Sequence, residues 1–348
     1  MVFCTLKPKF TLVTEIMRKD SFPKFKALIK KTNQIAILAH WSPDGDAMGS
    51  CLALYHFLTA LGKKAKVIVP NAYPEFLYWL PGNKQVLNFE TDAKKVEKVL
   101  QNADLIFTLD FNSLKRIEQL GDLVLKAKAP KVMIDHHQQP ENYATYYYHD
   151  VNACSTCELV FDFICGLGKK ELIDAKIAAC LYTGLMTDTG SFKYPSVTAK
   201  THAVVAELLK TGIKPNDIHS AVYDSYSYQR LRLLGYALSE KLVVLKDIPA
   251  AYFLITEKEL AQFDYQKGDL EGIVNYPFSI KGVKVCALFN ETKDYIKVSL
   301  RSKGKIDVNK FARAYFHGGG HINAAGGKSM LGLSETEKLF VSAVKSLF

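Results

Sequence analysis

The chain has 348 residues, of which 48% are hydrophobic and 23% are charged, and this composition predicts one or two globular domains with buried cores. No apolar stretch is long enough to span a bilayer, and residues 1–20 lack the order of a secretory signal. Seven irregularly spaced cysteines exclude a disulfide framework and favour a reduced, cytoplasmic protein. The formal net charge of +10 favours anionic partners, although an ordinary lysine-rich surface would give the same charge.

The first half of the chain alternates short apolar runs with helical patterns. Buried strands are predicted in four runs, at 34–39, 66–70, 103–110 and 131–135. Periodic stretches such as 47–61, which precedes Gly62, predict helices between them, and Asp46 stands at the expected N-cap of that helix. A later helix is expected over 174–186. We therefore expect an α/β fold with a doubly wound, largely parallel sheet within residues 1–197.

The pattern changes after residue 197. Residues 198–240 are mostly helical in pattern and predict a helical linker. Residues 241–348 combine strand-like and helical patterns and predict a second, smaller α/β domain. Its strands are expected in KLVVLKD, AAYFLIT, VKVCALFN and DYIKVSLRS, and its helices near 256–262, 307–316 and 334–346.

Acidic and histidine residues stand at the ends of the predicted elements of the first half. They are His40, Asp44, Asp46, Asp110, Asp135, His136, His137 and Asp188, the last expected just after a helix. Because ligands of an open parallel sheet bind beyond the carboxyl ends of its strands, we expect these side chains to meet at one edge. Each acid alone would pass as a turn or cap residue, but four separate segments together favour a shared site.

The donor types of this edge point to metal chemistry. Carboxylate and imidazole ligands without thiolate suit Mn²⁺, Mg²⁺, Fe²⁺ or Zn²⁺. Six or more such ligands exceed the needs of one ion, whereas two ions about 3.5–4 Å apart, bridged by a shared carboxylate, would use them all. Such a pair activates a water molecule and binds a phosphoryl group. The sequence therefore predicts a site for two divalent cations.

Five motifs in order carry a resemblance to a known family. They are HWSPDGDAMGS (40–50), LD (109–110), DHH (135–137), TDTGSF (187–192) and VSLRSKGKIDVNKFARAYFHGGGHINAAGG (298–327). The chain resembles the DHH phosphoesterases with their DHH-associated C-terminal domain, and among them the NrnA-type nanoRNases. RecJ nucleases share the core motifs but are usually longer, and family II inorganic pyrophosphatases lack GGGH. Ser42 stands where the family usually has Asn, and no predicted ligand is lost.

The resemblance implies a role for each residue of the predicted metal site. It implies one ion on His40, Asp44 and Asp110. It implies a second ion on Asp46, Asp110, His136 and Asp188, with Asp110 as the bridge. Mn²⁺ is the expected metal, with Mg²⁺ as the alternative. Asp110, Asp135 and His137 are the expected catalytic residues. Asp135 would orient an imidazole, and His137 would face the scissile phosphate as a charge stabiliser or proton donor.

The GGGH segment predicts a second, anion-binding site. Gly318, Gly319 and Gly320 would let backbone amides approach an anion. Arg301 and His321 are candidates for holding the terminal phosphate of a substrate, since the arginine offers a bidentate fork. Two further residues would add to this contact, namely Ser299 and His317. The resemblance puts this domain across a cleft from the metals, so that it would measure substrate length.

The resemblance implies a phosphoesterase that hydrolyses very short oligoribonucleotides to mononucleotides and dephosphorylates 3′-phosphoadenosine 5′-phosphate. Its partners would be short RNA or DNA oligonucleotides or phosphorylated nucleotides, without a membrane, and a homodimer is one expected arrangement. Three alternatives stay open: hydrolysis of linear or cyclic dinucleotides, hydrolysis of pyrophosphate, which the GGGH tail disfavours, and a degenerate module that binds nucleotide without hydrolysis.

Two further patterns stay outside this site. Cys154 and Cys157 form a lone CxxC pair without the second ligand pair that a zinc site needs. A redox role stays open, but buried structural cysteines are favoured. Ser155 and Thr156 between them are weak candidates for a place near the metals. The run 146–148 of three tyrosines could stack bases, but packing in a loop or edge strand is favoured.

Overall fold

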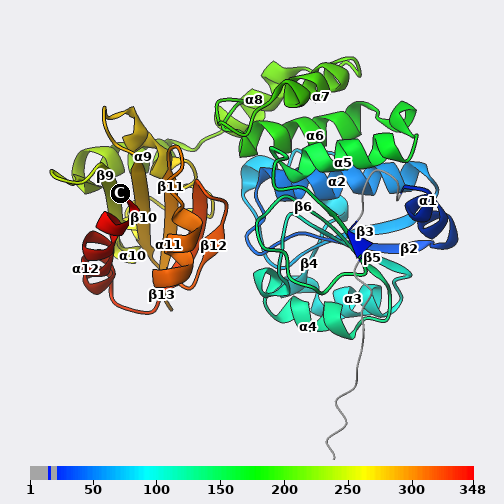
Figure 1. The fold of residues 1–348 in the computed structure, drawn as a ribbon, viewed down its shortest axis with the longest axis horizontal. Helices are drawn as coiled ribbons and strands as arrows, with labels where there is room; N and C mark the ends of the chain where they lie inside the picture. Colours follow the sequence, from blue (N-terminus) through cyan, green and yellow to red (C-terminus); the bar gives the residue numbers. More distant parts are fainter. Residues whose placement is uncertain (1–14, 17–21) are drawn as a thin grey trace, which may run out of the picture. The chain divides into compact units, whose positions relative to one another are not determined.

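The computed structural model describes residues 15–16 and 22–348, which form two compact units divided between Val222 and Tyr223 (Figure 1). This division falls inside the segment 198–240, so the helical linker stays a prediction. Most of residues 1–20, where no secretory signal was expected, lie outside the described residues. Among the described helices, none combines the length and the apolar composition needed to cross a membrane.

The first unit is built on a parallel sheet of seven strands in the described residues. Its order is β1-β7-β6-β5-β2-β3-β4, and all six pairings are parallel. The strands are β1 Glu15–Ile16, β2 Gln34–Leu38, β3 Lys64–Val69, β4 Leu87–Asn88, β5 Leu105–Leu109, β6 Lys131–Asp135 and β7 Tyr146–His149. From β2 the chain adds strands on one side and then crosses to the other, so the order reverses between β2 and β5. The predicted doubly wound sheet is confirmed.

Helices cover both faces of this sheet. The α-helices are α1 Phe22–Lys31, α2 Gly45–Ala60, α3 Phe89–Gln101, α4 Gln119–Lys126, α5 Thr156–Gly166, α6 Ala175–Asp188, α7 Ala199–Leu209 and α8 Pro215–Tyr223. Short helices are η2 Glu75–Leu77, η3 Asn83–Gln85, η4 Leu114–Ile117 and η5 Lys170–Leu172. Figure 1 shows α2, α5 and α6 on one face and α3 and α4 on the other. Strands covered on both faces read as continuous apolar runs, and all five residues of β5 are indeed buried.

Helix α2 is central to the first unit. It packs against α5 and α6, and twelve of its 16 residues are buried. Glycines allow α2 and α6 to approach closely: a Cβ built on Gly49 would lie 2.5 Å from the backbone oxygen of Cys180. Since Asp46 lies in the first turn of α2 and Asp188 ends α6, this close packing also sets the distance between two candidate ligands.

The second unit is built on a mixed sheet of six strands in the described residues. Its order is β12-β13-β11-β10-β9-β8, and β9 and β10 form the parallel pair. The strands are β8 Leu242–Val244, β9 Ala250–Ile255, β10 Val285–Glu291, β11 Ile296–Ser302, β12 Gly319–Gly320 and β13 Ala324–Ser329. The helices are α9 Tyr228–Tyr236, η6 Ala237–Lys241, α10 Glu257–Ala261, η7 Ile273–Ser279, α11 Val308–Tyr315, α12 Leu333–Ala343 and η8 Val344–Leu347.

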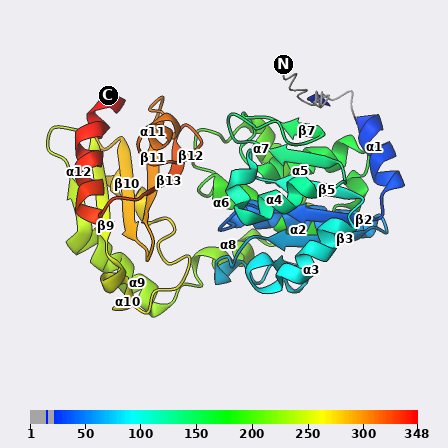
Figure 2. The same ribbon diagram turned by 90° about the horizontal axis from the view of Figure 1, so that it is seen from below.

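Two apolar clusters hold this second sheet. One joins α11 and α12 to β10 and β11 through Phe289, Phe311 and Phe340. These helices and strands are labelled in Figure 2. The other joins α9, α10 and η7 to the opposite face of β9 and β10 through Phe253 and Phe263. The strands and helices expected after residue 241 are present, and the smaller α/β domain is confirmed as a fold class.

Candidate metal centre

The predicted donors come together at the carboxyl edge of the parallel sheet. His40 and Asp44 lie in the loop after β2, and Asp110 follows β5 directly. The DHH residues end β6 and begin the loop after it. Asp188 is the last residue of α6 and not, as expected, a residue beyond the helix. The edge lies where the strand order reverses between β2 and β5, which is where open α/β sheets bind ligands.

The two acids of the first loop have different local roles. The carboxylate of Asp44, and not that of Asp46, caps helix α2 by accepting from the N–H groups of Asp46 and Ala47, both at 3.0 Å. The prediction of Asp46 as the N-cap was therefore wrong. Asp46 lies one residue inside the helix, which leaves its two oxygens for partners from other segments.

Three donors form a first group around one oxygen of Asp110. His40 Nε2 lies 3.4 Å from Asp110 Oδ2 and 3.9 Å from Asp44 Oδ2. One donor atom from each of these three side chains lies within 4.8 Å of the others. This is the set expected for the first ion.

A second group surrounds the other oxygen of Asp110. His136 Nε2 lies 3.5 Å from Asp110 Oδ1, 3.7 Å from Asp46 Oδ2 and 3.6 Å from Asp188 Oδ2. The two oxygens of Asp110 thus face different groups, as a bridging carboxylate requires. The assignment of these residues as ligands stays a prediction.

Each histidine of the cluster is anchored through Nδ1. His40 Nδ1 lies 2.8 Å from the backbone oxygen of Trp41, and His136 Nδ1 lies 3.1 Å from that of Ala153. Because a carbonyl oxygen only accepts, Nδ1 carries a proton in both rings, and Nε2 is the nitrogen that faces the carboxylates. Outer contacts of this kind orient metal-binding imidazoles.

His137 is held by a carboxylate instead. Its Nδ1 lies 2.7 Å from Asp135 Oδ1 and 3.7 Å from Asp110 Oδ1. Asp135 is fully buried, and its Oδ2 has no hydrogen-bond partner among the described residues. Asp135 therefore lies where the prediction requires, beside the ring that it would orient.

The N-terminus of α5 completes the site from a third direction. The N–H groups of Thr156 and Cys157 donate to the two oxygens of Asp46 at 2.6 and 2.9 Å. The hydroxyl of Thr156 donates to Asp110 Oδ1 at 2.9 Å. The positive end of the helix dipole also favours negative charge at this position. Thr156 is thus a functional candidate that the sequence analysis kept only as a weak one near the metals.

Backbone geometry helps to aim the central carboxylate. Asp110 has a φ of 63°, in the left-handed region that few residues other than glycine adopt. Such conformations cost about 1–3 kcal/mol and persist where the surroundings hold them in place. The conformation turns the chain directly after β5, at the residue whose carboxylate faces both groups.

Burial and proximity shift the proton affinities of these groups. Burial, reinforced by the charges of Asp110 and Asp188, raises the pKa of Asp46 well above its ordinary value. Burial also opposes charge on Asp110, but hydrogen bonds to His136 and His40 outweigh it and hold its pKa well below the usual range. Burial would lower the pKa of His136, but its hydrogen bond to Asp110 and its acidic neighbours raise it well above normal.

The donor set fits divalent cations. Asp46 and Asp110 are buried side by side, and among the described residues their ion pairs are with histidines alone, not with lysine or arginine. Carboxylates buried together repel each other, and after burial itself the charges of Asp110 and Asp188 raise the pKa of Asp46. Bound cations would relieve that repulsion, and oxygen and imidazole donors suit Mn²⁺ or Mg²⁺.

The predicted anion site of the second unit differs from its expected form. The N–H groups of Gly318, Gly320 and His321 donate to Ala312, Asn309 and Ala324 of the same unit. Gly319 and Gly320 form strand β12, paired with β13, so the segment is not an open loop of free amides. The amides of these three residues are therefore already bonded within the unit, whereas the predicted anion site requires free amides.

The other residues of the second unit that were predicted to bind a phosphate lie at least partly at its surface. Arg301 and Ser299 lie on β11 on the same face, both half-buried, and the guanidinium of Arg301 donates to the backbone oxygen of Leu300 at 3.0 Å. His317 is exposed and has a left-handed φ of 45°. These side chains are accessible to a ligand, and their roles stay predictions.

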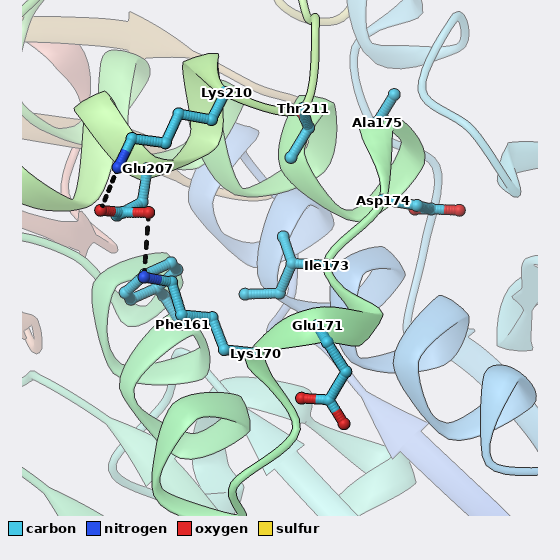
Figure 3. Close-up of a pocket in the computed structure, with 9 residues that line it drawn as sticks. All are labelled: Phe161, Lys170, Glu171, Ile173, Asp174, Ala175, Glu207, Lys210 and Thr211. Atoms are coloured by element: carbon cyan, nitrogen blue, oxygen red, sulfur yellow. Dashed lines mark hydrogen bonds and ion pairs between the residues drawn. The ribbon is translucent and has the colours of Figure 1, made fainter.

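A surface cavity of about 730 Å³ lies away from the candidate metal centre (Figure 3). It is lined by the start of α6 near Asp174, whereas Asp188 ends the same helix. Its two lysines, Lys170 and Lys210, both pair with Glu207, as the dashed lines of Figure 3 mark. The cavity therefore carries little free positive charge and is not the site of the predicted chemistry.

A parallel α/β unit with carboxylates and imidazoles beyond its central strands belongs to the class of domains that can hold divalent cations at a switch point. The chain belongs to the DHH family. The model of the DHH family N-terminal domain matches residues 34–185, and the model of the DHHA1 domain matches residues 248–348. The predicted family is confirmed.

Known proteins resemble the chain over most of its length. It is 30% identical over 325 residues to the probable bifunctional oligoribonuclease and PAP phosphatase NrnA of Streptococcus mutans, across 92% of this chain and 97% of that protein. An exopolyphosphatase-related protein of Bacteroides fragilis is 43% identical, with a TM-score of 0.89 over 94% of this chain and 96% of that one. RecJ of Thermus thermophilus, solved with Mn²⁺, has a TM-score of 0.56 at 13% identity, over 95% of this chain and 55% of that one, which supports the fold alone.

Proposed function

We propose that this protein is a metal-dependent phosphoesterase that hydrolyses very short oligoribonucleotides to mononucleotides and dephosphorylates 3′-phosphoadenosine 5′-phosphate. The observation that carries the proposal is the pair of carboxylate–imidazole groups that share Asp110 at the sheet edge. The name of the Streptococcus relative, which combines both activities, supports this substrate class. Dinucleotide hydrolysis, pyrophosphate hydrolysis and binding without hydrolysis are not favoured by that relative.

Two divalent cations, preferably Mn²⁺, would bind at this edge. One would be held by His40, Asp44 and Asp110. The other would be held by Asp46, Asp110, His136 and Asp188. When bound, such a pair supplies Lewis-acid stabilisation of phosphoryl oxygens and a nucleophilic water. The chain would contribute His137, oriented by Asp135, as a charge stabiliser or proton donor to the scissile phosphate. The buried surroundings of these groups strengthen their electrostatic effect on a phosphoryl group.

A substrate panel with Mn²⁺ tests the proposal. It contains 3′-phosphoadenosine 5′-phosphate, di- to pentaribonucleotides, cyclic dinucleotides, long single-stranded DNA and pyrophosphate. We expect turnover of the bisphosphate nucleotide and of the short oligoribonucleotides, with little on long DNA. Turnover of dinucleotides alone would replace the proposal by a dinucleotide phosphodiesterase, and no hydrolysis of any substrate would favour a binding module.

We also propose that Arg301 and His321, with Ser299 and His317, hold the terminal phosphate of short substrates. The accessible guanidinium of Arg301 supports this, because arginine binds phosphate through two parallel hydrogen bonds. Arg301→Ala should lose most activity on short 5′-phosphorylated oligoribonucleotides. Lys305→Ala, which removes an exposed charge from the loop after the same strand, should keep wild-type activity. Equal activity of the two variants would refute the contact.

A further inference from the structure

Arg116 lies beside the candidate metal centre, although no motif named above includes it. It belongs to η4, the short helix that follows β5 and Asp110. Its backbone oxygen accepts a hydrogen bond of 2.7 Å from the N–H of Trp41, the residue directly after His40. This bond ties η4 to the loop of the first motif and fixes Arg116 at the carboxyl edge of the sheet.

Arg116 is half-buried, and its guanidinium has no partner in the part of the chain that the structure describes. Within residues 15–16 and 22–348 it makes neither a side-chain hydrogen bond nor an ion pair. Its neighbour Lys115 is different, because that side chain is 90% exposed and reaches Glu141 at 4.0 Å. An arginine carries five N–H donors in a planar fork, so Arg116 keeps a full set of donors available.

The chain around Arg116 places it next to the carboxylate that faces both groups. Helix η4 begins at Leu114, four residues after Asp110, and the bond from Trp41 holds Arg116 beside the loop that carries His40. His40 Nε2 lies 3.4 Å from Asp110 Oδ2, and His137 Nδ1 lies 3.7 Å from Asp110 Oδ1. The segment that carries Arg116 therefore lies beside the residues that supply these donors.

A permanent cation at this position opposes the binding of divalent cations. Like charges at short range repel, so Arg116 costs metal affinity and gains nothing from a carboxylate partner. An anion that binds at the centre would offset this repulsion, because Arg116 would then have an oppositely charged partner. The planar fork of a guanidinium matches two oxygens of a phosphoryl group, whereas the compact ammonium of lysine does not.

We propose that Arg116 binds the phosphoryl group that is hydrolysed at this centre, with its fork directed at two non-bridging oxygens. The inference rests on the proposed phosphoesterase function and adds a substrate-binding residue to it. Arg116 would stabilise the negative charge of that group from the side of η4. No bond to Arg116 forms or breaks.

Two readouts separate substrate binding from a structural role. In Arg116→Ala we expect kcat/KM for 3′-phosphoadenosine 5′-phosphate to fall about tenfold or more, as loss of charge-assisted hydrogen bonds predicts. Inhibition by inorganic phosphate should weaken in parallel. The Kd of Mn²⁺, measured by calorimetry, should stay equal or become tighter. Arg116→Lys should recover part of the loss, and Lys115→Ala should match the wild type within about twofold, as a surface charge predicts.

Two results would overturn the inference. One is an Arg116→Ala variant with wild-type kcat/KM and wild-type phosphate inhibition. The other is a variant that loses Mn²⁺ affinity and thermal stability together with activity, which indicates a structural residue. If the wild type hydrolyses no substrate, the proposed function fails separately. Calorimetric binding of inorganic phosphate to the Mn²⁺-loaded wild type and variant then still decides the role of Arg116.

Discussion

At the scale of single residues, Asp110 connects the two donor groups. Asp110→Asn keeps the size of the side chain and removes the charge that both groups share. We expect loss of Mn²⁺ binding by calorimetry and a decrease of kcat of about a thousandfold or more, as when residues of one catalytic unit are removed.

Asp122→Asn is a matched control for this change, because Asp122 is exposed on α4. It should bind Mn²⁺ and turn over substrate like the wild type. Retained Mn²⁺ binding in Asp110→Asn would contradict a bridging role.

The sequence predicted which residues meet at the edge but not their finer contacts. Asp44 and Asp46 both fit the N-cap of α2. Sequence patterns place a helix start only to within a few residues, so they cannot decide between two acids two positions apart. The hydrogen bond from Thr156 to Asp110 joins positions 46 apart in the chain. No local pattern predicts such a contact, because it arises where the start of α5 meets the end of β5 in the folded sheet.

At the scale of elements, the contact between α2 and α6 sets the geometry of the site. Gly49→Ala would place a methyl group 2.5 Å from the backbone oxygen of Cys180, which cannot move aside without shifting α6. We expect the free energy of unfolding to fall by about 2 kcal/mol, the usual cost of overpacking. Mn²⁺ affinity should fall too, since the shift separates Asp46 from Asp188.

Gly235→Ala is the matched control for this glycine. Gly235 lies in α9, and a Cβ there would meet no atom within 4 Å. This change should raise the free energy of unfolding by up to about 1 kcal/mol through helix propensity. Chemical denaturation of both variants measures the difference, and equal stabilisation of both would disprove close packing at Gly49.

A second element-scale contact gives a pH dependence. Glu259 accepts hydrogen bonds from Tyr236 at 2.6 Å and from Lys241 at 2.7 Å, and its other oxygen caps α10 at Thr256. Burial alone would raise the pKa of Glu259, but these bonds outweigh it and lower the pKa to about 2. Because the folded pKa lies below the unfolded one, this contact stabilises the fold above about pH 4 and weakens as the pH falls toward 2.

Glu259→Gln should therefore lower the free energy of unfolding by about 2 kcal/mol at pH 7. The difference from the wild type should shrink in urea denaturation at pH 3. Glu257→Gln, an exposed acid in the same turn, should have a smaller effect at both values. A difference for Glu259→Gln that is constant with pH would show that its charge does not carry the contact.

Elements with a strong apolar pattern were predicted well. Strands that form mainly through hydrogen bonds to neighbouring strands were not. The apolar runs of β2, β3, β5 and β6 marked strands because both faces of the sheet are covered. By contrast, β13 reads AAGGKS and takes strand form through its ladder with β11. The tyrosines of β7 were expected in a loop or edge strand, but β7 lies between β1 and β6.

At the scale of the whole molecule, the donor groups lie in the unit that ends at Val222. A ligand that binds the folded state stabilises it by about 2.7 kcal/mol at a hundred times its Kd. We therefore expect Mn²⁺ to raise the unfolding temperature of this unit in scanning calorimetry, and chelation to reverse the shift.

The second unit serves as the internal reference for this measurement. Its transition should stay in place when Mn²⁺ is added, and Asp110→Asn should abolish the shift of the first unit. An equal shift of both transitions would mean that the units unfold as one, or that the metal binds elsewhere.

The order of the donors along the chain has a consequence for synthesis. His40 leaves the ribosome early. The helix α5, whose amides bind Asp46, is made only after the DHH residues, and Asp188 at the end of α6 is made later still. A nascent chain that stops before α6 lacks one donor of the second group and the partner that packs against α2. On the proposed function, hydrolysis begins only when translation has passed Asp188, so fragments released from stalled ribosomes before that point cannot degrade nucleotides.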